Sequence, residues 1–133
     1  AATTAGEALI RFAVAVERLD EADAAFRELL RRKREDPDLL VRYGDFLVGP
    51  RANPDAALAQ YAQALIWRAD DATTRAKMVD IHLRAAAAHA AALEYTSAEA
   101  RLATARRLGV EPGSTQDERM RQIKETLSEV RGR

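Results

Sequence analysis

The sequence predicts an all-α protein in which antiparallel pairs of helices follow one another as an α-solenoid. Alanine supplies 29 of the 133 residues, and alanine is the strongest helix former. A helix start signal, Asp or Asn followed by Pro, occurs at Asp36-Pro37 and again at Asn53-Pro54. A pattern of small and large residues recurs after 35 and 41 residues. Periods of about 34 residues that are built from paired helices are typical of α-solenoids.

The first pair of helices is predicted from two start signals. Thr4 and Glu7 form the pattern of a capping box, and Asp20 is placed as the N-cap of a second helix after a short break. Apolar residues then recur at helical spacing. In the first helix they are Leu9, Ile10, Ala13 and Val16, and in the second Ala22, Phe26, Leu29 and Leu30. We interpret the charged segment 31–34, RRKR, as a solvated helix end rather than a nucleic-acid site, because acidic residues flank it.

The second pair follows the two Pro signals. The helix after Asp36-Pro37 carries one apolar face, and the segment VGPRANP is expected to turn the chain. The helix after Asn53-Pro54 begins with PDAALAQYAQAL, residues 54–65. The residues on the apolar face of the first helix of this pair are Leu40, Tyr43, Gly44 and Leu47.

The third pair begins with an unusually long helix, about 71–93, opened by Asp70 or Asp71. Thr96 and Glu99 form a capping-box pattern for its partner, which is expected to end at Gly109. A final helix is expected after Thr115, with Glu118 completing its capping box. Its apolar face holds Met120, Ile123, Leu127 and Val130. The total is about seven helices and no strand.

The second helices of the three pairs align with one another over 19–30, 54–65 and 95–106. Small residues let two helices approach closely, and a large residue four positions later fills the space between neighbouring pairs. The aligned sets are Ala22, Ala57 and Ala98; Ala24, Ala59 and Ala100; Phe26, Tyr61 and Leu102; and Leu29, Ala64 and Ala105.

This pattern resembles the tetratricopeptide repeat (TPR) family over roughly residues 5–112. The second repeat matches best, whereas Leu29 and Leu102 depart from the family's alanine and aromatic positions, and Ala69 stands in place of a proline. The resemblance implies a single domain folded as a right-handed α-solenoid. Its repeats would span about 5–36, 37–70 and 71–112, with a capping helix at about 115–131. An ordinary alanine-rich helical bundle is the alternative, favoured by the long helix at about 71–93.

Composition excludes several classes of protein. No cysteine is present, which rules out disulfides and thiolate chemistry. Basic and acidic residues balance at 21 each, so nothing favours nucleic acid or an anionic membrane as a partner. No apolar stretch approaches the roughly 18 residues of a membrane span. The compartment stays open, since either cytoplasm or bacterial periplasm suits this composition.

Few residues could carry chemistry. His82 and His89 are seven apart and lack carboxylates at metal-ligand spacing, so we expect one to pack between helices and the other to be solvated. No pair of carboxylates indicates acid–base catalysis, and no glycine-rich loop indicates phosphate binding. We expect neither enzyme activity nor a cofactor. Trp67 is interpreted as core packing between repeats, with an exposed anchor for a partner as the alternative.

The TPR resemblance implies a partner protein or peptide on a concave face built mainly by the first helix of each pair. Its candidate residues are Arg11, Arg42, Asp45, Lys77, Asp80 and Arg84. Their mixed charges favour a mixed-charge or amphipathic ligand. The family's carboxylate clamp is not expected, because the only asparagine, Asn53, lies at a turn.

Three functions are therefore considered. The first is a non-catalytic adaptor within a bacterial multiprotein assembly. The second is a self-associating structural domain, in which the alanine-rich face of residues 84–92 or the final helix forms a homodimer. The third is a helical regulatory domain of a larger protein.

Overall fold

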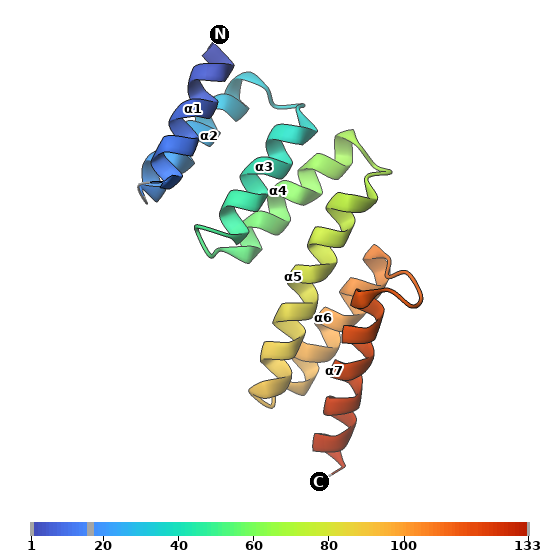
Figure 1. Cartoon of the computed structure of the whole chain (residues 1–133). Helices are drawn as coiled ribbons and strands as arrows, with labels where there is room; N and C mark the ends of the chain where they lie inside the picture. The colour runs from blue at the N-terminus through green and yellow to red at the C-terminus, as the bar shows by residue number, and fades with distance from the viewer. Residues whose placement is uncertain (1, 16–17, 133) are drawn as a thin grey trace. The chain divides into compact units, whose positions relative to one another are not determined.

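The computed structural model describes residues 2–15 and 18–132, with side chains from residue 5 onward, and this part of the chain is entirely helical apart from its turns. The prediction of an all-α protein with seven helices and no strand is confirmed for these residues. The helices are α1 (Ala2–Ala15), α2 (Leu19–Arg32), α3 (Pro37–Val48), α4 (Pro54–Trp67), α5 (Ala72–Ala91), α6 (Tyr95–Leu108) and α7 (Thr115–Arg131) (Figure 1).

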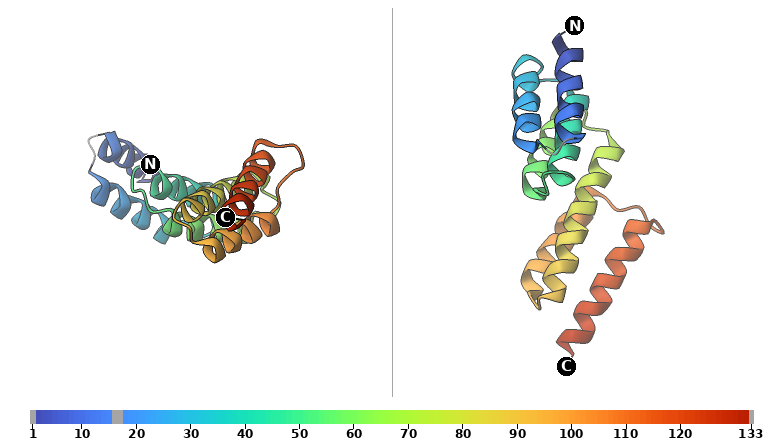
Figure 2. Two further views of the ribbon diagram at one scale, coloured as in Figure 1. Left: turned by 90° about the horizontal axis from the view of Figure 1, so that it is seen from below. Right: turned by 60° about the vertical axis from the view of Figure 1, so that its left-hand side comes forward.

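Two compact units make up the chain, one ending at Asp71 and the other beginning at Ala72. The division falls at the predicted junction between the second and third repeats. The first unit holds α1 to α4 and the second holds α5 to α7. Helices α1 to α6 each pack most extensively on a neighbour in the chain, which gives the pairs α1/α2, α3/α4 and α5/α6, whereas α7 packs mainly on α5 (Figure 2).

An aromatic cluster forms the centre of the first unit. The ring centroids of Phe26 and Tyr43 lie 5.1 Å apart, and those of Phe26 and Phe46 lie 5.2 Å apart. All three side chains are buried. Because Phe26 belongs to α2 and the other two rings to α3, the cluster joins the first helix pair to the second. Offset aromatic packing at such distances adds to the stabilisation from buried area alone.

Helices α3 and α4 approach closely at Gly44. A Cβ atom added there would lie 2.5 Å from Cε1 of Tyr61, well inside van der Waals contact. Tyr61 is itself almost fully buried. The absence of a side chain at Gly44 is therefore what allows the tyrosine ring to pack directly against the backbone of the neighbouring helix.

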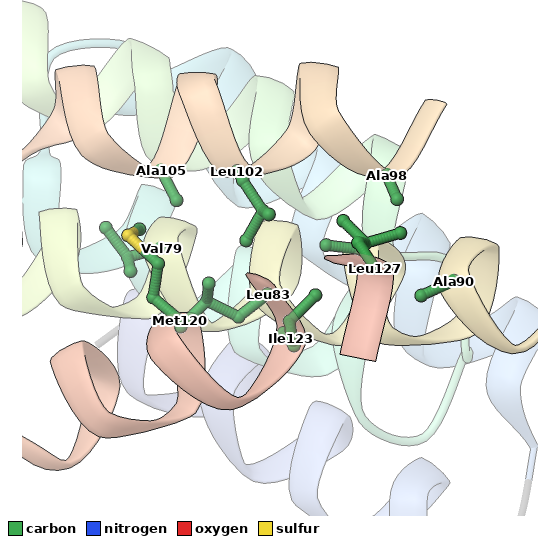
Figure 3. Close-up of a cluster of buried hydrophobic side chains, with 10 residues drawn as sticks. Val79, Leu83, Ala90, Ala98, Leu102, Ala105, Met120, Ile123 and Leu127 are labelled. Atoms are coloured by element: carbon green, nitrogen blue, oxygen red, sulfur yellow. The ribbon is translucent and has the colours of Figure 1, made fainter. Parts of the chain in front are cut away.

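The core of the second unit is a single cluster drawn from all three of its helices (Figure 3). Alanines at the α5/α6 contact allow these two helices to pack closely, while leucine and methionine side chains fill the space beside α7. The cluster contains Val79, Leu83, Ala86 and Ala90 of α5, Ala98, Leu102 and Ala105 of α6, and Met120, Ile123 and Leu127 of α7.

The positions aligned from the sequence have equivalent environments in the three pairs. The alanines at the first aligned position are fully buried, and the large residues four positions later are exposed by 5% or less. The last aligned set, Leu29, Ala64 and Ala105, is equally buried. The remaining set, Ala24, Ala59 and Ala100, is exposed in all three pairs. The alignment therefore identifies the inward and outward faces of the second helices correctly. The buried residues are Ala22, Ala57, Ala98, Phe26, Tyr61, Leu102, Leu29, Ala64 and Ala105.

Two of the predicted helix caps are confirmed. The side-chain oxygens of Asp36 and Asn53 each accept a hydrogen bond of 3.2 Å from the backbone N–H three residues later. The predicted stop at Gly109 is also correct, since its φ of 111° is a conformation that glycine adopts at low cost.

Three other predicted caps are wrong by one or two residues. Helix α2 begins at Leu19, so Asp20 lies inside it, and α6 begins at Tyr95, ahead of Thr96. The final helix is capped by Ser114, whose hydroxyl accepts from the backbone N–H of Asp117, rather than by Thr115.

The start of the first helix also differs from the prediction. Helix α1 already includes Thr4, so this residue does not precede the helix as an N-cap would. Leu9, assigned to the buried stripe, is about half exposed, while Ile10 and Ala13 are buried as expected. Val16 lies outside the described residues.

Candidate protein-interaction surfaces

The candidate residues of the first unit lie on α1 and α3. Arg11 is exposed. Arg42 forms an ion pair with Glu7, with 2.6 Å between Nη1 and Oε1, and so joins α3 to α1. The hydrogen bond from Arg42 lowers the pKa of the Glu7 carboxyl, and the positive charge of Arg11 helps to lower it. Asp45 accepts a hydrogen bond of 2.6 Å from the hydroxyl of Tyr61. Arg11 is therefore the candidate in this unit whose charge is most available to a partner.

The candidate residues of the second unit lie on α5. Asp80 accepts from two guanidinium groups, Arg84 on the same helix and Arg119 on α7, each at 3.0 Å. Asp80 therefore joins α5 to α7 and is already neutralised. Arg84 remains exposed, and Lys77 is partly buried. The predicted mixture of charges is present on this helix, but part of it stabilises the fold.

Hydrogen bonds from tyrosine to aspartate connect successive helices in the first unit. The hydroxyl of Tyr43 donates to Asp23 at 2.5 Å, and Arg27 also contacts Asp23, at 2.9 Å. Asp23 is only 7% exposed. Asp23 could not be singled out from the sequence, where it is simply an acidic residue beside an apolar helix face. Both of its oxygens are engaged, so its role is to stabilise the fold.

Burial raises the pKa values of both tyrosines. For Tyr43 and Tyr61 the loss of solvation disfavours the phenolate, and the nearby carboxylates of Asp23 and Asp45 raise the pKa further. Both hydroxyls are therefore neutral donors over the whole physiological range of pH.

A groove of about 460 Å³ runs between α6 and α7. Its floor is apolar, with Leu102 and Leu127 at the bottom and the small side chains of Ala103 and Ser128 beside them. Charged side chains form the rim. The lining residues are Glu99, Leu102, Ala103 and Arg106 of α6, and Lys124, Leu127, Ser128 and Arg131 of α7.

The two ends of this groove differ in charge. At one end Arg131 forms an ion pair of 2.6 Å with Glu99, and its guanidinium lies 5.3 Å above the ring of Tyr95. At the other end Nη2 of Arg106 lies 3.9 Å from the sulfur of Met120. Neither Arg106 nor Lys124 is paired with a carboxylate among the described residues. The groove therefore has a neutralised end and a cationic end.

Trp67 lies at the end of α4 and is 49% exposed, so the interpretation as core packing is wrong. Its neighbour Ile66 is 68% exposed. Helix periodicity alone did not reveal this, because both residues follow an alanine-rich stretch that offers little contrast between its faces. Two adjacent exposed apolar side chains fit the alternative interpretation, an anchor for a partner.

The histidines follow the expected division only in part. His82 is buried and its Nδ1 lies 3.1 Å from Arg101 across the α5/α6 contact, while His89 lies 3.2 Å from Glu94 and is partly exposed. In the described part of the chain no three His, Asp or Glu side chains converge as metal ligands would. The segment 31–34 is exposed throughout, and Arg32 forms the expected i,i+4 pair with Glu28 at 3.4 Å.

No helix of the described residues has both the length and the apolar character needed to cross a bilayer. No family model, no curated protein and no solved structure matches this chain.

Proposed function

We propose that this chain is a non-catalytic interaction module of the TPR type, whose helix pairs stack as a right-handed α-solenoid and bind a partner protein or peptide. The observation that carries the proposal is the equivalence of the three pairs. In the second helix of each pair, three of the aligned positions are buried and one is exposed, as a repeated packing unit requires.

The first helices of the pairs supply the proposed binding residues. Arg11 on α1 and Arg84 on α5 are exposed. Arg42, Asp45 and Asp80 have a dual role in the proposal, because each also joins two helices. The proposed ligand carries charges of both signs.

The state of the buried polar groups favours binding over catalysis. Asp23 is the one buried carboxylate of the described residues, and hydrogen bonds to Tyr43 and Arg27 occupy it. A general acid or base needs a carboxyl group that can exchange a proton with a substrate in a cleft. A carboxylate held by two neighbouring side chains is poorly suited to that task.

The proposal is tested by affinity capture from a lysate of the source organism, with mass spectrometry as the readout. The bait is compared with the variant Arg11→Glu/Lys77→Glu. We expect one protein to be enriched by the parent and lost with the variant. That protein, once purified, should bind the parent in calorimetry and bind the variant at least about tenfold more weakly.

A matched control changes the net charge equally on other surfaces. Arg34→Glu/Arg107→Glu alters two exposed cations that lie outside the first helices. Circular dichroism should show the same helix content for all three proteins. Equal capture by all three, or capture of no protein but the chain itself, would contradict the proposal, and the second result would favour self-association.

A further inference from the structure

We propose that the groove between α6 and α7 binds an amphipathic helix of a partner protein, with acidic side chains at one end of that helix. This inference rests on the proposed interaction function and assigns it a second surface and a class of ligand. The first helices of the pairs contribute nothing to this groove, because its lining comes from α6 and α7 alone.

The spacing of the lining residues indicates a helical ligand. On α6 the groove is lined by residues 99, 102, 103 and 106, and on α7 by residues 124, 127, 128 and 131. Both sets follow the i, i+3, i+4, i+7 pattern, so each wall is one face of a helix over two turns. Such walls form a straight channel about 10 Å long, and a third helix fits between two others in this way.

The floor and the walls favour leucine-sized anchors on the ligand. Leu102 and Leu127 belong to the buried cluster, so they are held in place from below (Figure 3). Ala103 and Ser128 line the groove and are exposed, and their small side chains leave room above the floor. An apolar stripe on an incoming helix would cover the floor without moving the core.

The charged residues on the rim of the groove determine which charge the ligand helix should carry and at which end. The contacts Arg106 to Met120 and Arg131 to Glu99 show that α6 and α7 run antiparallel along the groove. Arg106 and Lys124 therefore lie toward the same end, without a carboxylate partner in the described part of the chain. The opposite end is already neutralised by Glu99 and Arg131. A bound helix with Asp or Glu near the cationic end would complete the pairing, whereas a basic helix would be repelled.

The test uses two labelled synthetic peptides and fluorescence anisotropy. Both peptides are helical and carry leucines at i, i+3, i+4 and i+7, one with glutamates flanking the stripe and the other with lysines. We expect the parent to bind the glutamate peptide at least about tenfold more tightly than the lysine peptide. Ala103→Trp, which fills the groove without touching the core, should weaken glutamate-peptide binding by about tenfold or more. Arg106→Glu/Lys124→Glu should reverse the preference between the two peptides.

Control variants separate this groove from the first-helix surface. Arg34→Glu/Arg107→Glu changes the net charge equally and should bind the glutamate peptide like the parent. So should Arg11→Glu/Lys77→Glu, so peptide binding and partner capture can fail independently. The inference is overturned if the parent binds neither peptide, if it binds both equally, or if the Arg34→Glu/Arg107→Glu control loses as much affinity as Arg106→Glu/Lys124→Glu. A dimer in sedimentation experiments that Ala103→Trp abolishes would also overturn it, by making a second copy the occupant.

Discussion

Gly44 lies so close to the ring of Tyr61 that a methyl group cannot be placed between them. We expect Gly44→Ala to lower the free energy of unfolding by about 1–3 kcal/mol, because the tyrosine or the helices must shift. This outcome would reverse the usual gain of up to about 1 kcal/mol from replacing a helical glycine by alanine. Urea denaturation followed by circular dichroism measures the difference.

Gly6 provides the matched comparison on α1. A Cβ atom there would meet Cδ2 of Leu29 at 2.9 Å, the mobile end of a side chain that can rotate away. Gly6→Ala should therefore cost less than Gly44→Ala. Adding Tyr61→Leu to Gly44→Ala should cost less than the sum of the two separate changes, because the leucine has no ring at that contact. Equal costs for the two alanine variants would contradict this account of the close approach.

The buried tyrosines predict a loss of stability at alkaline pH. An unfolded tyrosine ionises at a pKa of about 10, whereas burial and Asp45 raise the pKa of Tyr61 in the folded protein. The folded state thus favours the neutral phenol, and its contribution to stability is complete below pH about 10 and is lost as the pH rises through the folded pKa. Tyr61→Phe should be less stable by about 1 kcal/mol at neutral pH, through loss of the bond to Asp45.

Urea denaturation of the parent and of Tyr61→Phe across the alkaline range provides the measurement. The difference in unfolding free energy between the two proteins should narrow above pH about 10, because only the parent must ionise Tyr61 on unfolding. A difference that stays constant with pH would mean that Tyr61 does not contribute through its ionisation.

Single residues show where sequence reasoning succeeds and where it stops. The burial of Phe26, Tyr61 and Leu102 followed from helical spacing and from alignment, which are local patterns. The hydrogen bond from Tyr43 to Asp23 could not be predicted in the same way, because it depends on the register between two helices. An acidic residue that will be buried looks, in sequence, like one that will be solvated.

The helix caps give a prediction at the level of elements. Asn53→Ala should destabilise the protein by about 1 kcal/mol, since the side chain accepts a hydrogen bond from the N–H of Ala56 at the start of α4. Asp20→Ala is the control, because Asp20 lies inside α2 and its side chain forms an exposed ion pair with Arg51. That pair is worth about 0–1 kcal/mol. Thermal unfolding of both variants measures the contrast, and a larger loss for Asp20→Ala would contradict the observed helix boundary.

The presence of each helix could be predicted from the sequence, but the end residues of some helices could not. The start and stop signals in the sequence located all seven helices. Asp36 and Asn53 cap the helices that the Pro signals predicted. The capping-box pattern at Thr96 failed because α6 extends back to Tyr95, whose ring lies beneath Arg131 of α7. A contact of this kind between two helices cannot be predicted from the local signal for the start of a helix.

The whole molecule is expected to unfold in steps that follow its two compact units. Leu102 belongs to a buried cluster made only from α5, α6 and α7, so Leu102→Ala should cost about 2–5 kcal/mol there. Hydrogen exchange read by mass spectrometry should speed up over α5 to α7 more than over α1 to α4. Phe26→Ala should give the opposite distribution, because Phe26 lies in the aromatic cluster of the first unit.

If hydrogen exchange speeds up uniformly along the chain in either variant, the two units unfold as one.

The candidate sites also depend on the arrangement of whole helices. Exposed polar residues such as Arg11 could be proposed from sequence, but the α6/α7 groove could not, because residues 99–106 and 124–131 form its walls only once the two helices lie side by side.

Trp67 is the only tryptophan in the chain, and half of its surface is exposed at the end of α4. Its fluorescence should therefore resemble that of an indole in water even in the native state, and heating or urea should change its emission colour little while helicity collapses. The same property makes Trp67 a built-in optical sensor of contact. A blue shift on mixing with another protein would report directly that Trp67 has been covered, with no label attached.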